Sequence, residues 1–339
     1  MHVPAEDETL HAPGAQRWWN ESFYANFFDA RGTWGGFVRV GLSPNNRFAD
    51  GGVYLFLPDG RLGVVRAVER RQGHAEPISA GRIRWERVEP LRRWRIDAEG
   101  DLFHFADGKE LLAEQRGLAE HLRRSFRLAL ELEGVHEPFD PYPAQKSRLP
   151  LDGLRGLLTE TRGMPARMAA LGDQLQRASR LVGARHYEQA CRVRGTLVLD
   201  GREHALDGAG IRDHSWGVRE WEAFTRYRWL NGCLGPGFSF SLTRLQIVGF
   251  RFTTGFVCRD GRCVRVKSWK LGGGGREVRA EVRTEDGETH VITGDVEREL
   301  PISIGGAGYL TEITTRMTRY RWRDLSGYGV AEFLEQLVP

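Results

Sequence analysis

Residues 208 to 221 form the densest group of side chains that could do chemistry in this sequence. The stretch is bounded by glycines and places an acid, Asp213, directly before an imidazole, His214. An aspartate inside an apolar barrel has its charged form disfavoured by desolvation, so its pKa rises and it can donate a proton. Protonation of an alkene would produce a carbocation. We therefore predict Asp213 as a general acid, with His214 orienting it or acting as the base that removes a proton or activates water.

Aromatic residues near this acid could stabilise the cation that it would generate. The faces of indole and phenol rings carry a negative quadrupole, which attracts a cation without trapping it as a nucleophile would. The expected substrate-binding aromatic residues are Trp216, Trp221, Tyr227 and Trp229. A structural interpretation stays open, because Arg212 or Arg219 could pair with Asp213 and lower its pKa instead. Trp216 could also plug one end of a barrel.

A second polar group, His186-Tyr187-Glu188-Gln189, stands at the start of an expected strand. Because side chains alternate along a strand, Tyr187 and Gln189 would share one face, and His186 and Glu188 the other. One pair should line the interior unless the group is a surface strand end, and we assign substrate binding to Tyr187 and Gln189. A third, weaker group could act with them or could cap or plug the first barrel: Asn20, Glu21 and Tyr24.

Short apolar or alternating runs, separated by Asp-Gly turns, must position these groups. Dipeptides of this kind supply the positive φ angles that tight hairpin turns need. We expect strands over residues 36–42, 52–57, 62–68, 83–88, 92–97, 102–106 and 125–133 in the first half, and over 187–199, 222–230, 237–245, 248–257, 262–271, 278–284, 290–297 and 308–322 in the second. Each set could close into a barrel of roughly eight strands, wide enough to hold one small ligand.

The composition changes between the two sets of strands. Residues 136–150 are rich in proline, and residues 165–181 carry apolar side chains at helical spacing, which predicts a linker followed by an amphipathic helix. A second helix is expected over residues 330–337. The sequence thus predicts a mostly β protein with an N-terminal half (1–135), a Pro-rich linker and helix (136–185) and a C-terminal half (186–339). The two antiparallel barrels or curved sheets should pack together.

The motif Asp213-His214-Ser215-Trp216-Gly217 resembles the Asp-His-x-Trp-Gly signature of the lipocalin-like (double calycin) superfamily, which contains carotenoid 1,2-hydratase (hydroxyneurosporene synthase) and the AttH-like proteins. In that superfamily the signature opens the second half. Further similarity to a bacterial branch of it comes from residues 20–22 with 27–28, 186–189 and 327–333. The resemblance covers most of the chain and implies two lipocalin-like halves. Such proteins include hydratases, cyclases, catalysts of pericyclic reactions and binders, so the fold does not fix the activity.

Composition narrows the remaining possibilities. The chain of 339 residues has a formal charge of +4, but the arginines of segments 82–95 and 316–323 alternate with apolar residues as on an exposed strand face, so we expect no nucleic-acid partner. Residues 1–14 lack a basic stretch followed by an apolar run, and no later window approaches about 18 uninterrupted apolar residues. We therefore expect a cytoplasmic protein without a signal peptide or stable membrane insertion.

We expect no metal ion and no cofactor. The sequence has no phosphate loop, dinucleotide fingerprint, nucleophile elbow or His-Glu-x-x-His helix. Cys191 and Cys233 are expected to be buried thiols. Cys258 and Cys263 should face each other on a hairpin and stay reduced in the cytoplasm.

These inferences predict an enzyme without a cofactor that binds an isoprenoid, terpene or similar polyene and catalyses proton-initiated hydration, isomerisation or cyclisation. Two alternatives stay open. The protein could be a non-catalytic carrier of a hydrophobic ligand, or a pericyclase that acts by shape complementarity and needs no proton donor. Substitution of Asp213 distinguishes the proton-initiated reaction from the pericyclic one.

Overall fold

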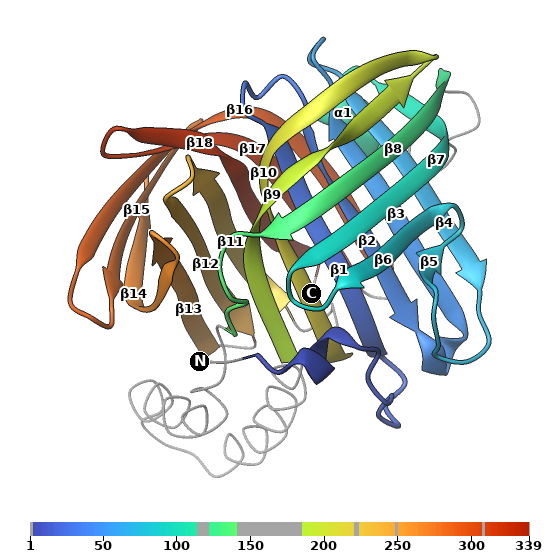
Figure 1. Cartoon of the computed structure of the whole chain (residues 1–339), viewed down its shortest axis with the longest axis horizontal. Coiled ribbons are helices and arrows are strands. Elements are labelled where there is room, and N and C mark those ends of the chain that lie inside the picture. Colours follow the sequence, from blue (N-terminus) through green and yellow to red (C-terminus); the bar gives the residue numbers. More distant parts are fainter. Residues whose placement is uncertain are drawn as a thin grey trace.

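The computed structural model describes residues 3–113, 122–140, 185–219, 224–247, 250–306 and 309–338. These residues form two β bodies that lie side by side (Figure 1). The first body contains β1 (Trp19–Asp29), β2 (Gly35–Ser43), β3 (Phe48–Phe56), β4 (Leu62–Arg70), β5 (Ile78–Ala80), β6 (Ile83–Glu89), β7 (Arg93–Phe105), β8 (Arg123–Gly134), β9 (Arg185–Leu199) and β10 (Arg202–Val218). The second contains β11 (Phe224–Leu234), β12 (Phe238–Ile247), β13 (Phe250–Arg259), β14 (Arg262–Gly272), β15 (Glu277–Thr284), β16 (Thr289–Gly306), β17 (Tyr309–Trp322) and β18 (Leu325–Val338). The short helices are η1 (Ala5–Glu8), η2 (Pro44–Asn46) and α1 (Gly108–Ala113).

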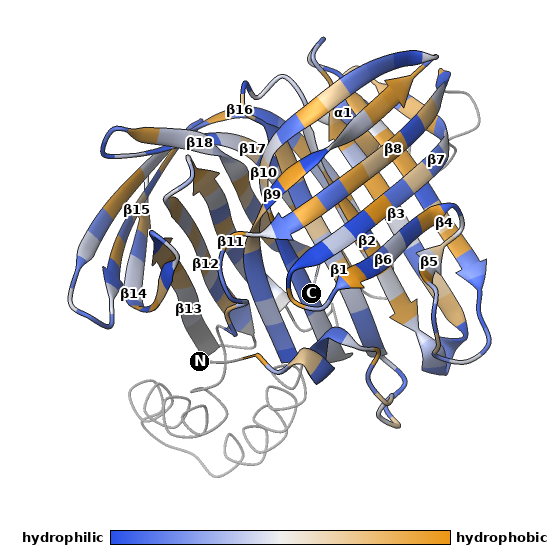
Figure 2. Cartoon of the chain, viewed as in Figure 1, coloured by the Kyte–Doolittle hydropathy of each residue, from blue (hydrophilic) through white to orange (hydrophobic). Residues whose placement is uncertain are grey.

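The first body is a 10-stranded antiparallel sheet in the order β4-β3-β2-β1-β10-β9-β8-β7-β6-β5. A short additional pairing between β4 and β7 brings the sheet round on itself. Alternate side chains of β7 are buried, and Figure 2 shows the corresponding alternation of hydrophobic and hydrophilic residues along β7 and β8. This period of two directs apolar side chains such as Trp94, Ile96 and Leu130 into one continuous core.

The second body is a closed barrel of the strands β11 to β18. Aromatic and aliphatic side chains fill its interior. Phe238 stacks on Trp322 with ring centroids 4.1 Å apart, and Phe240 meets Tyr320 edge to face. The described interior is therefore a packed core, as is common in small barrels.

The two bodies meet where β1 and β10 pack against β11 and β18. This junction has its own apolar cluster, which includes Tyr24, Ile211 and Trp229. At its centre the Asn26 Nδ2 donates to Asn231 Oδ1 at 2.9 Å, and the backbone N–H of Ile211 donates to Asn26 Oδ1 at 2.9 Å. One face of β1 and β10 thus belongs to the first core, and the other belongs to the junction.

The fold confirms the mostly β prediction of two packed bodies. The sequence analysis assigned residues 186–218 to the C-terminal half and predicted a strand over 187–199 but none over 202–218. These residues form β9 and β10, which are hydrogen-bonded between β1 and β8 in the first body. The strands expected over 92–97 and 102–106 are one strand, β7. The helix expected over 165–181 lies outside the described residues.

The predicted C-terminal helix is wrong. Residues 325–338 form β18, which pairs with β11 on one side and with β17 on the other. The apolar side chains of this segment have helical spacing in the sequence because both faces of the strand are buried, Ala331 on the barrel core and Val330 in the junction. Backbone pairing on both edges overrides the local pattern.

The cysteine predictions are confirmed except for the redox state. Cys191 and Cys233 are buried free thiols, and Cys258 lies opposite Cys263 across a turn at Asp260-Gly261. Cys258 and Cys263 are joined by a disulfide, whereas the sequence analysis expected reduced thiols. No helix in the described part of the chain is long and apolar enough to span a membrane.

Candidate functional site

The residues singled out in β10 lie on two different faces of the sheet. Successive side chains of a strand point to opposite sides, so Arg212 and His214 enter the interior of the first body while Asp213 lies in the junction. Trp216 shares the interior face with His214, and Trp229 approaches from the barrel side of the junction. The segment therefore contributes to two separate polar groups.

The first group, the histidine cluster, consists of His11, Glu21, His74 and His214. The fully buried Glu21 carboxylate accepts from all three imidazoles: His11 Nδ1 lies 2.7 Å from Oε1, His214 Nε2 2.9 Å from Oε1, and His74 Nε2 2.6 Å from Oε2. Burial alone would raise the pKa of Glu21, but these hydrogen bonds hold it well below its ordinary value. Burial lowers the pKa of His214, although Glu21 opposes the shift.

A second buried network joins this cluster through Tyr187. The Tyr187 hydroxyl donates to Glu8 Oε1 and lies 3.1 Å from His214 Nδ1. Arg212 Nη2 lies 2.8 Å from the same Glu8 oxygen, and Arg212 Nε donates to Gln189 Oε1 at 2.8 Å. Burial opposes the ionisation of Glu8, but the Arg212 guanidinium and the Tyr187 hydroxyl lower its pKa. The predicted sharing of one face by Tyr187 and Gln189 is confirmed.

Aromatic rings fix the imidazoles of the histidine cluster. His11 stacks on Trp216 with centroids 3.7 Å apart and planes 9° from parallel, and Phe23 stacks on His214 at 4.2 Å. Trp216 thus packs in the interior of the first body, on the face of β10 opposite Asp213. Stacked rings restrict the directions in which the imidazole nitrogens can point.

The second group, the junction acids, consists of Asp213, Glu188 and Glu332. Asp213 lies opposite Tyr24 on β1 and opposite Glu188 on β9. Burial and the nearby Glu188 raise the pKa of Asp213 to about 6, although His186, Arg219 and Arg39 oppose the shift. Burial and Asp213 likewise raise the pKa of Glu332 to about 7. Asp213 and Glu332 therefore have pKa values near neutral pH.

Basic and aromatic side chains surround the junction acids. His186 Nε2 lies 2.7 Å from Glu188 Oε1, and Arg219 donates to Ser215 Oγ at 2.9 Å. Tyr24 meets Trp229 with ring centroids 5.2 Å apart, and Trp229 is the register partner of Glu332. Burial raises the pKa of Tyr24 well above its ordinary value, and Glu332 and Asp213 add to this shift. The Arg212 pairing considered for Asp213 does not form, because Arg212 binds Glu8.

A cavity of about 730 Å³ lies further along the junction. Its lining from β1 and β10 includes Phe28 and Ala209, and its lining from the barrel includes Cys233, Ser239 and Tyr328. The volume is in the range of sites for drug-sized ligands. Asp213 is not among the described lining residues: four positions of β10, about 13 Å, separate it from Ala209.

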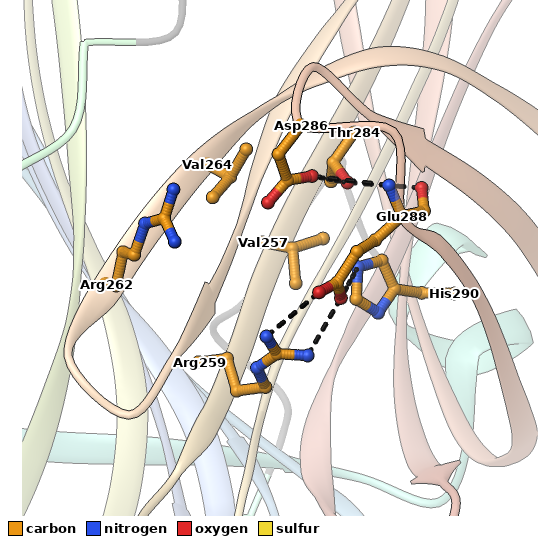
Figure 3. Close-up of a pocket in the computed structure, with 8 residues that line it drawn as sticks. All are labelled: Val257, Arg259, Arg262, Val264, Thr284, Asp286, Glu288 and His290. Atoms are coloured by element: carbon orange, nitrogen blue, oxygen red, sulfur yellow. Dashed lines mark hydrogen bonds and ion pairs between the residues drawn. The ribbon is translucent and has the colours of Figure 1, made fainter.

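A much smaller hollow at one end of the barrel has a volume of about 30 Å³ (Figure 3). Two hydrogen bonds from Arg259 to Glu288, at 2.8 and 3.0 Å, cross it. This volume is far below the roughly 300 Å³ at which pockets for small-molecule ligands begin, so a drug-sized ligand would not fit.

The remaining predicted residues have mixed positions. Tyr227 is half-buried and packs against the junction cluster, and Trp221 lies outside the described residues. Asn20 donates to the Leu42 carbonyl at 3.2 Å, which suits the capping role considered for it. Sequence reasoning missed several residues of the two groups and of the network that joins the histidine cluster: Glu8, His11, His74 and Glu332. Of these, the sequence could have indicated only Glu332, because it lies in the segment 327–333, which resembles the lipocalin-like superfamily.

Comparison with known proteins finds the same fold. Residues 4–337 match the family model described as "Domain of unknown function (DUF7064)". A putative AttH from Nitrosomonas europaea has a TM-score of 0.59 at 12% identity, covering 96% of this chain and 95% of that chain. CghA with Sch210972 has a TM-score of 0.54 at 11% identity, covering 98% and 97%. Kievitone hydratase from Nectria haematococca has a TM-score of 0.52 at 9% identity, covering 99% and 96%. No curated protein matches the sequence.

Proposed function

We propose that this chain, a member of the DUF7064 family with the fold of a putative AttH, is an enzyme. It uses its own acids to convert a hydrophobic small molecule at the junction. The reaction begins with protonation of an alkene and ends in hydration, isomerisation or cyclisation. The substrate is an isoprenoid or a similar polyene. The fold relatives include a protein named as a hydratase and a structure solved with a small molecule, which is compatible with this class of reaction.

The observation that carries the proposal is the raised pKa of Asp213, about 6, together with its position between the two bodies. A general acid is most effective when its pKa lies near the working pH, because it is then protonated often enough and still donates readily. Glu332, with a pKa of about 7, can return a proton to Asp213 or take one from the product. The two acids come from different bodies, so a ligand held beside Asp213, between the bodies, would meet both.

The surroundings of Asp213 suit a cationic intermediate. Tyr24 and Trp229 present aromatic rings beside the acids, and ring faces stabilise a carbocation without bonding to it. Burial is the main cause of the raised pKa of Asp213, and the nearby Glu188 adds to it, whereas His186, the ion-pair partner of Glu188, opposes it. We assign Asp213 the acid role, Glu332 the proton exchange and the two rings the stabilisation of the cation.

The experiment is incubation of the protein with a panel of apolar polyenes in D₂O, followed by mass spectrometry of the recovered molecules. Proton-initiated chemistry transfers one solvent-derived deuteron to carbon, so products heavier by one deuterium are expected. Products without deuterium would contradict the proposal and favour a pericyclic reaction. Polyenes recovered unchanged after tight binding would contradict it and favour a carrier.

The carrier alternative has its own supporting observation. The cavity of about 730 Å³ has a mixed apolar and polar lining, and the junction acids are not among its described lining residues. A ligand held only there would be stored without contact with Asp213. The ligand affinity of Ala209→Phe, a change in the cavity lining, measures how far binding depends on the cavity.

A further inference from the structure

The histidine cluster brings three imidazoles to one buried carboxylate from widely separated parts of the chain. The ligand-type atoms of His11, Glu21 and His214 all lie within 4.8 Å of one another. His11 comes from the segment before β1, Glu21 from β1 and His214 from β10. His74, between β4 and β5, bonds the second oxygen of Glu21. This spacing across the sequence explains why no local motif indicated the cluster.

Among the described residues, no lysine or arginine forms an ion pair with the Glu21 carboxylate. Glu8, the neighbouring buried acid, pairs with Arg212. The ion-pair partners of Glu21 among the described residues are all histidines. Burying an ionised carboxylate is unfavourable unless a positive charge accompanies it. Either a protonated imidazole or a bound cation can supply that charge.

The donor atoms suit a transition metal ion. Imidazole nitrogen and carboxylate oxygen are the ligands that Zn²⁺ takes in sites with three protein ligands and one open position. Such ligands lie about 2.0–2.2 Å from the metal and therefore about 3.3 Å from one another. The Glu21 Oε1 atom is 2.7 Å from His11 Nδ1 and 2.9 Å from His214 Nε2. These ligand atoms would therefore have to move apart by only roughly half an ångström to bind the ion.

A second layer of contacts holds the ligands in a suitable orientation. The Tyr187 hydroxyl can accept a hydrogen bond from His214 Nδ1–H while it donates to Glu8, which leaves Nε2 free to bind a metal. His74 donates to Glu21 Oε2, so Oε1 is the oxygen directed at His11 and His214. Metal-binding imidazoles and carboxylates are typically oriented by such outer contacts.

We propose that His11, Glu21 and His214 bind one divalent metal ion of the zinc class, oriented by Tyr187 and His74. The site lies in the interior of the first body, on the face of β10 opposite the junction acids. It is independent of the reaction assigned to Asp213. The side chain of His11 keeps 18% of its surface exposed, so the segment before β1 provides the route by which the ion enters.

The test is titration of chelator-treated full-length protein with Co²⁺, a spectroscopic substitute for Zn²⁺. One Co²⁺ should bind per chain and give the strong visible absorption of a four-coordinate ion, and one equivalent of Zn²⁺ should abolish that absorption. His11→Asn removes a ligand from a partly exposed segment, where the fold depends on it least. It should weaken Co²⁺ binding by about 100-fold or more. The matched control is His204→Asn, because His204 packs against Trp34 in the same body, outside the cluster.

Three results would overturn the proposal. The first is that the wild-type protein binds no stoichiometric Co²⁺. The second is that folded His11→Asn binds Co²⁺ as tightly as the wild type. The third is that the control His204→Asn weakens Co²⁺ binding as much as His11→Asn. Nitrogen-15 NMR of the metal-free protein adds a direct readout of the competing explanation: His214 protonated on both nitrogens and unchanged by Zn²⁺ would show that a proton, not a metal, balances Glu21.

Discussion

Asp213 and His214 are neighbours in the sequence, but their side chains lie on opposite faces of β10. His214 Nε2 is 2.9 Å from Glu21 in the interior of the first body, whereas Asp213 lies among the junction acids and raises the pKa of Glu332 across the junction. The sequence analysis expected Asp213 and His214 to act together. In the structure they instead belong to two separate groups, which have only the strand β10 in common. Substitutions in one group should leave the chemistry of the other unchanged.

The first prediction concerns the stability of Asp213→Asn as a function of pH. The folded pKa of Asp213 is raised from 3.8 to about 6, so the folded state favours the neutral carboxyl. Its contribution to stability is fully present below pH 4 and is lost as the pH rises through about 6. Replacement by a neutral amide should therefore stabilise the protein at pH 8, by up to about 3 kcal/mol, and have little effect at pH 4.

Thermal unfolding of wild type and Asp213→Asn at the two pH values checks this prediction. The expected signature is a higher Tm for the variant at pH 8 alone. A variant that is destabilised equally at both pH values would instead show that the Asp213 carboxylate is a structural ion-pair partner.

The second prediction concerns the buried pair of Glu8 and Arg212. Removing one partner leaves the other charge buried and unpaired, so Glu8→Gln should cost about 3–5 kcal/mol of unfolding free energy. The matched control is Glu99→Gln, which breaks an exposed pair with Arg82 and should cost less than about 1 kcal/mol. Denaturant unfolding measures both. Equal costs for the two variants would be inconsistent with a buried, ionised Glu8.

The sequence predicts the strands of the fold best where one face is exposed. In β7 and β15, buried and exposed residues alternate, so the period of two is visible. In β1 nearly every residue is buried, because one face meets the first core and the other meets the junction. The pattern then has no period, and the sequence analysis did not identify β1 as a strand. The same double burial gave residues 330–337 the appearance of a helix.

The candidate site was predictable only in part, for a related reason. The local segment of Asp213 and His214 identified the residue types, and strand alternation correctly placed Tyr187 with Gln189. The partners that decide their roles come from distant segments: Glu21 is 193 residues from His214. Contacts between residues so far apart in the sequence depend on the order of the strands in the sheet, which the local spacing of residues does not reveal.

The third prediction tests the cavity at the junction. Ala209→Phe adds a ring at a lining position and should lower the affinity for a cavity-bound hydrophobic ligand at least about tenfold by occupying its space. Ala205→Phe, at an exposed position of the same strand, is the control. Fluorescence titration with an apolar polyene compares the two. Undiminished affinity in Ala209→Phe would place the ligand elsewhere.

The fourth prediction concerns the pH dependence of turnover. Asp213 acts in its protonated form, so activity should be highest at low pH and fall as the pH rises through about 6 to 7, where Asp213 and Glu332 lose their protons. A profile of kcat against pH, over the range in which the protein stays folded, measures this fall in activity. Turnover that rises over this interval would assign the carboxylate a base role.

The most direct test of the central claim, that Asp213 supplies the proton, is the rate of deuterium transfer to a polyene in D₂O by Asp213→Asn. The amide keeps the size of the side chain but removes its transferable proton. The rate should fall by about 10² to 10⁴, while Asp97→Asn, the same change at an exposed position of β7, should leave it unchanged. A folded Asp213→Asn protein that transfers deuterium at the wild-type rate would contradict the account.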